Sequence, residues 1–353
     1  MSAETPVAAG PQTTATGAGR DATPGAEPGP GAAPGHPPDP AAPTDPELTV
    51  IVISYNTRDL TLACLRTLYA TTRRTRFRTV VYDNASTDGS AEAVAAQFPQ
   101  VELVASTDNL GFAGANNAVA AAAETEWLLL LNPDTEVHEG AVDNLLDFSR
   151  AHPGAGITGG RTVFRDGSLN IASCWNRITP WSAFCKATGL TAAFRGTTLF
   201  DPEGIGGWKR DSVREVDIVV GCFFMIRKAL WDELGGFDLR YFMYGEEADM
   251  CLRARKLGYR PMITPDAQIM HLVGAATKGV ADRKIVMMAR SRSTLIRDHW
   301  PAPLVPLGLG LMWLWGAMRV GKARLRARLE GRDGAPYWDR IWAQRSDWLR
   351  GYE

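Results

Sequence analysis

Short apolar runs alternate with amphipathic segments from Leu48 onward. Leu48–Ser54 is almost continuously apolar and β-branched, which predicts a strand buried on both faces. Arg58–Tyr69 places leucines and a tyrosine at helical spacing and predicts a helix. The same alternation continues, with strands expected at Phe77–Asp83, Val101–Ala105 and Trp127–Leu131 and helices at about Ser90–Gln97 and Ala113–Glu124. Strands and helices at this spacing predict a parallel, doubly wound α/β sheet.

The pattern is less regular in the second half of the chain. After a helix expected at His138–Arg150, the region Arg161–Glu215 is rich in Gly, Trp and Thr, and we expect loops and short strands over the site. The later expected elements are a strand at Val216–Arg227, a short helix at Ala229–Leu234, a helix at Gly245–Leu257 and a last short strand at Arg260–Thr264.

Polar side chains follow four of the predicted strands. They are Ser54, Tyr55 and Asn56 after the first, Asp83 and Asn84 after the second, Asn109 after the third, and Asn132 and Asp134 after the fourth. Ligands of open α/β sheets bind at the carboxyl ends of the strands. The four strand ends therefore predict one binding site.

Composition separates the chain into parts. Residues 1–46 hold eleven of the 22 prolines and no run of large apolar residues, so they are predicted to be a disordered tail. The net charge of −1 argues against general nucleic-acid binding. The five cysteines lack a Cys-x-x-Cys spacing, which predicts reduced thiols rather than disulfides or a zinc site.

The C-terminal part, 301–353, is predicted to be an apolar and basic helical extension. Leu304–Met318 is apolar but shorter than the ~20 residues of a membrane-spanning helix. Six basic residues against one acid follow within Arg319–Arg332. An interfacial segment on an anionic membrane fits this pattern, and a core helix docked on residues 47–300 is the alternative.

Several segments in this order resemble the family 2 glycosyltransferases, and among them the rhamnosyltransferase-like members. The matching segments are Val52-Ile-Ser-Tyr-Asn56, Asp83-Asn-Ala-Ser-Thr-Asp-Gly89, Asn109-Leu-Gly-Phe-Ala113 with Asn116-Asn117, Leu131-Asn-Pro-Asp134, Gly235-Gly-Phe-Asp238 and Glu246-Glu-Ala-Asp249, followed by His271. The resemblance covers residues 48 to 300 and implies a GT-A fold with helices on both faces of a mostly parallel sheet. A dehydrogenase is disfavoured, because Ser54-Tyr-Asn-Thr57 replaces the glycine-rich loop expected after the first strand.

The resemblance also implies a nucleotide-diphosphate sugar donor, a divalent Mg²⁺ or Mn²⁺ ion and inverting transfer. By position, Asp83 matches the acid that contacts the pyrimidine or ribose, and Glu247 matches the second acid of a Glu-Asp motif, commonly the general base. Asn132 and Asp134 match the Asp-x-Asp metal motif, with Asn132 in place of its first acid, and His271 matches a histidine that contacts the metal or a phosphate in part of the family. The nucleotide-sugar-binding residues implied are Ser54, Tyr55, Asn56, Asp83, Asn84, Asn109, Gly111, Phe112, Asn116 and Asn132.

Purely structural roles remain as alternatives to metal binding at two of these positions. Asn132-Pro133-Asp134 is also a typical turn sequence. His271 is equally compatible with a buried, hydrogen-bonded histidine.

Three acids compete for the role of general base. On a helix that begins near Gly245, Glu246 and Asp249 share a face, and Asp249 lies four residues before Arg253, which predicts an ion pair. Glu247 points about 100° away from Glu246 and has no basic partner on its own face. Glu247 is therefore the predicted base.

The sequence thus predicts an inverting hexosyltransferase that uses a dTDP- or UDP-sugar, with dTDP-rhamnose as the first candidate. The acceptor expected is a lipid-linked glycan of cell-wall or surface polysaccharide synthesis. The expected location is cytoplasmic, peripheral to the inner face of the plasma membrane. A catalytically silent sugar-nucleotide-binding subunit of a membrane-associated assembly is the alternative, and a glycan-binding module is a third possibility.

Overall fold

The computed structural model describes residues 45–272, 281–332 and 334–353. The tail predicted for residues 1–46 lies outside the described residues, apart from its last two positions.

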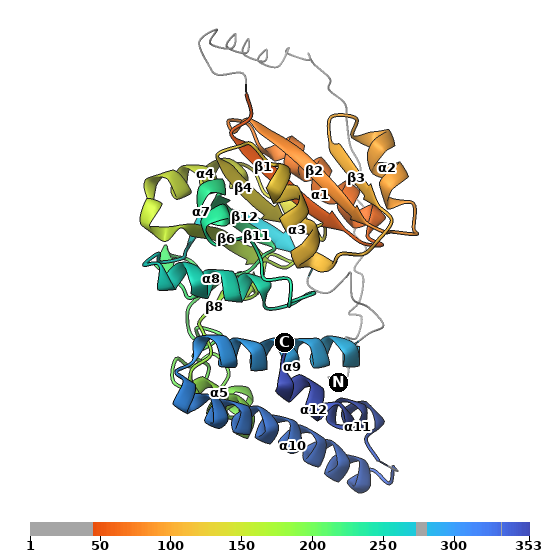
Figure 1. Ribbon diagram of the computed structural model, residues 1–353, viewed down its shortest axis with the longest axis vertical. Coiled ribbons are helices and arrows are strands. Elements are labelled where there is room, and N and C mark those ends of the chain that lie inside the picture. Colours follow the sequence, from red (N-terminus) through yellow and green to blue (C-terminus); the bar gives the residue numbers. More distant parts are fainter. Residues whose placement is uncertain (1–44, 273–280, 333) are drawn as a thin grey trace, which may run out of the picture. The chain divides into compact units, whose positions relative to one another are not determined.

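A ten-stranded mixed sheet forms the centre of the described chain (Figure 1). Its order is β3-β2-β1-β4-β11-β6-β12-β5, with β7 paired to β6 and β9 paired to β12. The first four strands are mutually parallel: β1 (Leu48–Ser54), β2 (Phe77–Asn84), β3 (Glu102–Ser106) and β4 (Trp127–Leu131). Their carboxyl ends therefore lie at one edge, and the predicted parallel arrangement is confirmed.

The other half of the sheet is mixed. β11 (Phe223–Arg227) runs antiparallel to β4 and to β6 (Ile157–Val163), whereas β12 (Met262–His271) runs parallel to β6 and antiparallel to β5 (Thr135–Val137). The short strand predicted at Arg260–Thr264 is in fact the first part of the longer strand β12, so the predicted length was wrong. The register of β12 shifts between Thr264 and Gln268, so the chain passes Pro265 in an irregular step and then resumes pairing as far as His271.

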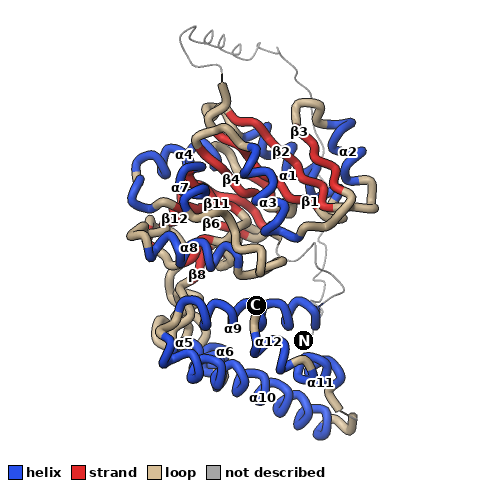
Figure 2. Tube along the Cα trace, in the orientation of Figure 1, coloured by secondary structure: helices blue, strands red, loops and turns tan. Residues whose placement is uncertain are grey.

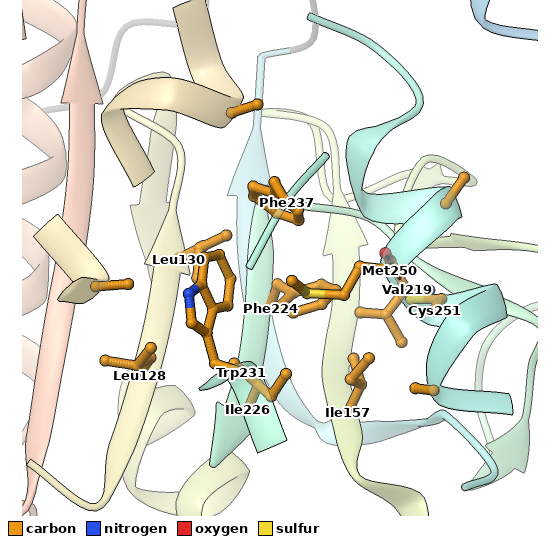
Figure 3. Packing of buried hydrophobic residues seen from close by; sticks show 14 of the residues in the cluster. Leu128, Leu130, Ile157, Val219, Phe224, Ile226, Trp231, Phe237, Met250 and Cys251 are labelled. Atoms are coloured by element: carbon orange, nitrogen blue, oxygen red, sulfur yellow. Dashed lines mark hydrogen bonds between the residues drawn. The ribbon is translucent and has the colours of Figure 1, made fainter. Parts of the chain in front are cut away.

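Helices cover both faces of the sheet, as predicted (Figure 2). One core joins alternate residues of β1, such as Val50, to α1 and α4; the other joins residues such as Ile51 to α3 and α8. Figure 3 shows the second core, with Trp231 and Phe237 in edge contact at 4.8 Å between ring centroids. The helices concerned are α1 (Arg58–Thr71), α2 (Ser90–Gln97), α3 (Gly111–Ala122), α4 (Ala141–Ala151), α7 (Lys228–Glu233) and α8 (Glu246–Lys256).

The expectation of only loops and short strands in Arg161–Glu215 was wrong. Besides β7 (Leu169–Asn170), β8 (Cys174–Trp175) and β9 (Arg214–Glu215), the region forms helices α5 (Pro180–Thr188) and α6 (Leu190–Ala193). Thr179 caps α5 in a capping box with Ser182, and Pro180 stands at its start. The run Val216–Arg227 is also interrupted, because β10 (Ile218–Val219) pairs with β8 and only β11 joins the main sheet.

Four helices follow the sheet: α9 (Ala281–His299), α10 (Val305–Leu329), α11 (Pro336–Ala343) and α12 (Arg345–Arg350). A 3₁₀ turn, Ala302–Leu304, leads into α10. The apolar run Leu304–Met318 is therefore part of a longer helix than predicted. Within the described chain, Ala302–Leu329 is the one helix long and apolar enough to cross a membrane, a criterion of length and composition only, and 22% of its apolar window is buried.

Helix α9 is connected to earlier parts of the chain by specific contacts. Arg292 of α9 makes two hydrogen bonds of 2.8 Å to Glu203, whose carboxylate also accepts from Ser182 of α5. Ser291 of α9 donates to the backbone carbonyl of Tyr244, just before α8. The C-terminal helices therefore support the start of α8, where the acid pair lies.

Candidate functional site

The turn after β1 is joined to the turn after β2. The Asn56 side-chain oxygen accepts from the Thr87 backbone N–H at 2.8 Å, and the Asn56 N–H donates to the Ser86 hydroxyl at 2.9 Å. Tyr55 is exposed, whereas the Ser54 hydroxyl is buried within 3.1 Å of two threonine hydroxyls. Tyr55 and Asn56 therefore lie at the surface of the site, and the Ser54 side chain points into the protein.

Asp83 presents a buried carboxylate oxygen at the end of β2. Its Oδ2 accepts from the Ser86 N–H at 3.0 Å, but its Oδ1 has no hydrogen-bond partner among the described residues. A buried acceptor without a donor is costly, so the free Oδ1 favours a ligand that brings a donor. A nucleobase N–H or a ribose hydroxyl has this chemistry.

Asparagines shape the loop between β3 and α3. Asn84 accepts from the Leu110 N–H at 2.7 Å and donates to the Gly111 carbonyl at 3.1 Å, and Asn109 accepts from the Gly111 N–H at 2.9 Å. Gly111 has a φ of +71°, and a Cβ on it would lie 2.4 Å from the Phe242 carbonyl oxygen. These residues fix the backbone conformation of the loop. The role of Asn84 and Gly111 is therefore to hold the loop in this shape.

The start of α3 meets the start of α8 at Gly221. A Cβ on Gly221 would lie 3.2 Å from the Phe112 ring and 4.0 Å from the Cβ of Glu247. Asn116, one turn further along α3, donates to the Phe112 carbonyl at 2.8 Å and keeps its buried Oδ1 without a partner among the described residues. The structure thus brings Glu247, the predicted base, close to Phe112 of α3.

Asp134 and His271 form a buried pair, with Nε2 of the imidazole 3.3 Å from Oδ1 of the carboxylate. The Leu272 N–H also donates to the Asp134 carbonyl at 3.1 Å, and Asn132 is held close by through its N–H, which donates to the Cys222 carbonyl at 3.1 Å. Burial lowers the pKa of His271, but Cys222 and the Asp134 carboxylate outweigh burial and raise that pKa to about 10. A cation at this pair would replace the imidazole proton.

The pair does not complete a metal site from protein groups alone. Residues 45–272, 281–332 and 334–353 contain no group of three or more His, Cys, Asp or Glu residues that could hold a metal ion.

Burial distinguishes the three acids of α8. Glu246 is 4% exposed, and its Oε2 lacks a partner within the described chain. Glu247 is only partly buried and accepts from the Gly245 N–H at 3.2 Å. Burial raises the pKa of both carboxyls, and the charge of Glu247 raises the pKa of Glu246 further.

Asp249 is instead held by Arg253 and His299. Its carboxylate lies 2.7 Å from Arg253 Nε, as the helical spacing predicted, and 2.8 Å from His299 Nε2. Burial works against the charged carboxylate, but the hydrogen bond to His299 and the charge of Arg253 lower the pKa of Asp249 overall. Both oxygens are occupied, so Asp249 joins α8 to α9.

We expect Asp249→Asn to destabilise the fold by about 3 kcal/mol, because it removes the buried carboxylate charge that pairs with Arg253 and weakens the bond to His299. The lowered pKa means that the contribution of Asp249 is present above its ordinary pKa of 3.8 and is lost as the pH falls through the folded-state value. Urea unfolding at pH 7 tests this, with the exposed Asp59→Asn as the control. Equal stability of Asp249→Asn and the wild type would contradict the assignment.

Two residues outside the predicted site list also shape it. Asn117 accepts from the Phe237 N–H and donates to the Phe237 carbonyl, both at 2.8 Å, and so fixes the loop that leads to α8. The Phe242 carbonyl accepts from the Phe112 N–H at 3.0 Å and packs on Gly111. The Asn116-Asn117 pair could have identified Asn117 from the sequence. The role of Phe242 depends on a contact between residues that are distant in the sequence.

Residues 49–234 match the family model described as Glycosyl transferase family 2. The chain belongs to this family. The glycosyltransferase is 27% identical over 289 residues to N-acetylglucosaminyl-diphospho-decaprenol L-rhamnosyltransferase of Mycobacterium tuberculosis, a match that covers 73% of this chain and 87% of the relative. A low-salt glycan biosynthesis hexosyltransferase of Haloferax volcanii is 24% identical over 215 residues, which cover 60% of this chain and 62% of the relative.

A solved structure confirms the predicted GT-A type of fold for the glycosyltransferase. The mannosyltransferase of Pyrobaculum calidifontis, in complex with GDP-Man and Mn²⁺, superposes with a TM-score of 0.51 at 22% identity and covers 86% of this chain and 85% of that one. The predictions of family 2 membership and of a hexosyltransferase are therefore confirmed.

Proposed function

We propose that this glycosyltransferase transfers rhamnose from dTDP-rhamnose, with inversion, to a lipid-linked glycan in cell-wall or surface polysaccharide synthesis. The observation that carries the proposal is the convergence of Phe112, Gly221 and Glu247 at the carboxyl ends of the parallel strands. The similarity to a rhamnosyltransferase named for a diphospho-decaprenol acceptor supports the donor sugar and the acceptor class. UDP-sugars are the second donor class.

The donor would lie across the strand ends. We assign to Asp83 Oδ1 the recognition of a donor hydrogen on the base or ribose, because this oxygen is buried without a partner in the described chain. Tyr55 and Asn56 would border the base, and the Asn116 Oδ1 is a second unpaired acceptor near Phe112.

A divalent Mg²⁺ or Mn²⁺ fits the Asp134–His271 pair. One carboxylate and one imidazole, adjacent and buried, are a suitable protein share of a site that donor phosphate oxygens complete. When bound, the ion would neutralise charge on the leaving diphosphate. The manganese complex of the Pyrobaculum calidifontis mannosyltransferase supports this assignment.

Glu247 would act at the acceptor. Its carboxylate accepts a hydrogen bond from the Gly245 backbone N–H at 3.2 Å, and burial raises its pKa toward the range of a general base. It would take the proton of the acceptor hydroxyl as that oxygen attacks the anomeric carbon. Glu246, more deeply buried, would remain protonated beside it.

We further propose a cytoplasmic enzyme that is peripheral to the inner face of the plasma membrane. Support comes from α10, which combines an apolar segment with basic residues in its C-terminal half. A lipid-linked acceptor would be reached from such a position.

Asp83→Ala is expected to weaken nucleotide binding by about 1–3 kcal/mol, the cost of a lost charge-assisted hydrogen bond. Calorimetric titration with dTDP and Mn²⁺ measures the change. Asp143→Ala is the matched control, since this buried carboxylate accepts hydrogen bonds from residues 73–75, including their backbone N–H groups. Equal dTDP affinity in Asp83→Ala and the wild type would remove Asp83 from the binding site.

The proposed reaction is tested by mass spectrometry of the acceptor. The protein is incubated with a polyprenyl-diphosphate-linked N-acetylglucosamine and, separately, dTDP-rhamnose, UDP-glucose, UDP-N-acetylglucosamine or GDP-mannose. We expect an acceptor heavier by one deoxyhexose with dTDP-rhamnose. A product with another donor would correct the donor assignment, and binding of donors without any product would support the silent-subunit alternative.

A further inference from the structure

An exposed apolar stripe runs along α10. Its members are spaced by three, four or seven residues and so share one side of the helix. They are Leu307, Leu311, Leu314, Met318 and Leu325, of which the first and the last two are exposed. The opposite side is packed: a Cβ on Gly308 would lie 2.6 Å from Ile296 of α9, and one on Gly316 would lie 3.0 Å from Trp348.

A second exposed apolar group, which we name the aromatic cluster, comes from α5 and the segment after α6. It consists of Trp181, Phe184, Phe194, Leu199 and Phe200. The Trp181 and Phe184 rings are stacked at 5.6 Å, and the Phe194 and Phe200 rings lie 4.8 Å apart. The indole N–H of Trp181 donates to the Leu199 carbonyl at 2.7 Å. All of these residues except Phe200 are at least 39% exposed, so the cluster is ordered but uncovered.

The stripe and the cluster lie on the same side of the helical layer. Helices α5 and α10 pack against each other, and Lys322 of α10 comes within 3.4 Å of a Cβ position on Gly189, which ends α5. Phe184 lies about 200° around α5 from Ser182, the residue that meets Glu203 and through it α9. Leu314 likewise lies about 200° around α10 from the buried Met312. Both apolar groups therefore face away from α9.

We propose that the aromatic cluster and the α10 stripe together contact an anionic bilayer, so that the chain is held by two elements. The inference rests on the proposed peripheral membrane location and adds residues 181–200 to it. Contiguous exposed apolar surface of this kind marks an interaction site. Lys322 and Arg328 lie about 60° to either side of the stripe, whereas Arg324 and Arg326 form ion pairs with Asp339 and Glu330 and Arg319 lies over the Trp338 ring. A lipid surface complements the charge of Lys322 and Arg328, whereas a second copy would bring these like charges together.

Contact through two elements has a consequence for catalysis. One helix lying on a bilayer leaves the protein free to roll about the helix axis. A second contact from the aromatic cluster removes this rotation. The cluster is connected to α9 through Glu203 and Arg292, and α9 bonds to α8 through His299 and Asp249. The acid pair on α8 would thereby keep a fixed orientation toward lipid-linked substrates.

The test uses full-length protein and vesicles of phosphatidylglycerol and phosphatidylethanolamine in equal parts, with sedimentation as the readout. We expect Leu199→Ser and Phe194→Ser each to weaken binding about tenfold, as the loss of one buried apolar side chain implies. Phe194→Tyr should bind within about twofold of the wild type, because tyrosine also partitions to the interface. Val104→Ser, at a similarly exposed apolar position on β3, is the control and should bind like the wild type. Thermal unfolding confirms that each variant is folded.

The outcomes distinguish failure of the two-element contact from failure of the proposed membrane location. If the wild type binds the vesicles and both serine variants bind equally well, α10 acts alone and the inference is overturned while the membrane location stands. If the wild type does not bind at low salt, both the location and the inference fail. If light scattering shows a dimer that Leu199→Ser dissociates, the cluster binds a second copy and the bilayer assignment is wrong.

Discussion

Replacing Glu247 by glutamine is expected to reduce sugar transfer by about 10²–10⁴-fold while donor affinity stays unchanged. The glutamine amide has nearly the same shape but cannot take a proton from the acceptor hydroxyl. Because burial raises the pKa of Glu247, wild-type transfer should fall as the pH drops through that raised value, where the base becomes protonated. Single-turnover transfer as a function of pH, with nucleotide affinity measured alongside, provides the comparison.

Glu246→Gln is the matched control for this prediction. Glu246 is buried, which raises its pKa, and the glutamine amide keeps the size and shape of its side chain. We expect transfer within about tenfold of the wild type. If Glu246→Gln loses transfer and Glu247→Gln keeps it, the assignment of the two neighbours must be exchanged.

The second large effect is expected for Asp134→Asn, which should lower turnover about a thousandfold by weakening the proposed metal site. The substitution removes the carboxylate charge beside His271 while keeping the size of the side chain. Mn²⁺ binding in the presence of dTDP, followed by electron paramagnetic resonance, should weaken in parallel. Asp143→Asn, at another buried carboxylate, is expected to leave Mn²⁺ binding unchanged. Full turnover of the wild type in excess chelator would contradict the metal role.

Two strands of the parallel half, β1 and β4, could be predicted because they are nearly continuous apolar runs, whereas β3 is mostly exposed. Leu48–Ser54 and Trp127–Leu131 have the composition of strands that are covered on both faces. The residue at which each apolar run stops therefore marks the end of the strand. The length of β12 was underestimated. Pro265 and Asp266 interrupt its apolar pattern, and such an interruption usually marks the end of a strand, but the pairing with β6 resumes after a register shift. Pairing with a distant strand is a tertiary property that the local pattern does not contain.

The location of the site could be predicted from the sequence, but the direction in which each side chain points could not. Ser54 and Asn84 are at the expected strand ends, yet their polar atoms are used in hydrogen bonds that hold the loops. The Asp249–Arg253 pair follows from a spacing of four residues and was confirmed, whereas the bond from Asp249 to His299 joins residues fifty positions apart. Local spacing determines the first contact, and only the packing of α9 on α8 creates the second.

Hydrogen–deuterium exchange with dTDP and Mn²⁺ tests most directly the claim that the strand ends form the donor site. The account predicts that the nucleotide slows exchange in peptides covering residues 54–58, 83–89, 109–113 and 132–135. A different cavity, of about 500 Å³, lies between α8 and α9 and is lined in part by Arg177, Lys256 and Arg260. Protection confined to peptides around that cavity, with the four strand ends unchanged, would contradict the account.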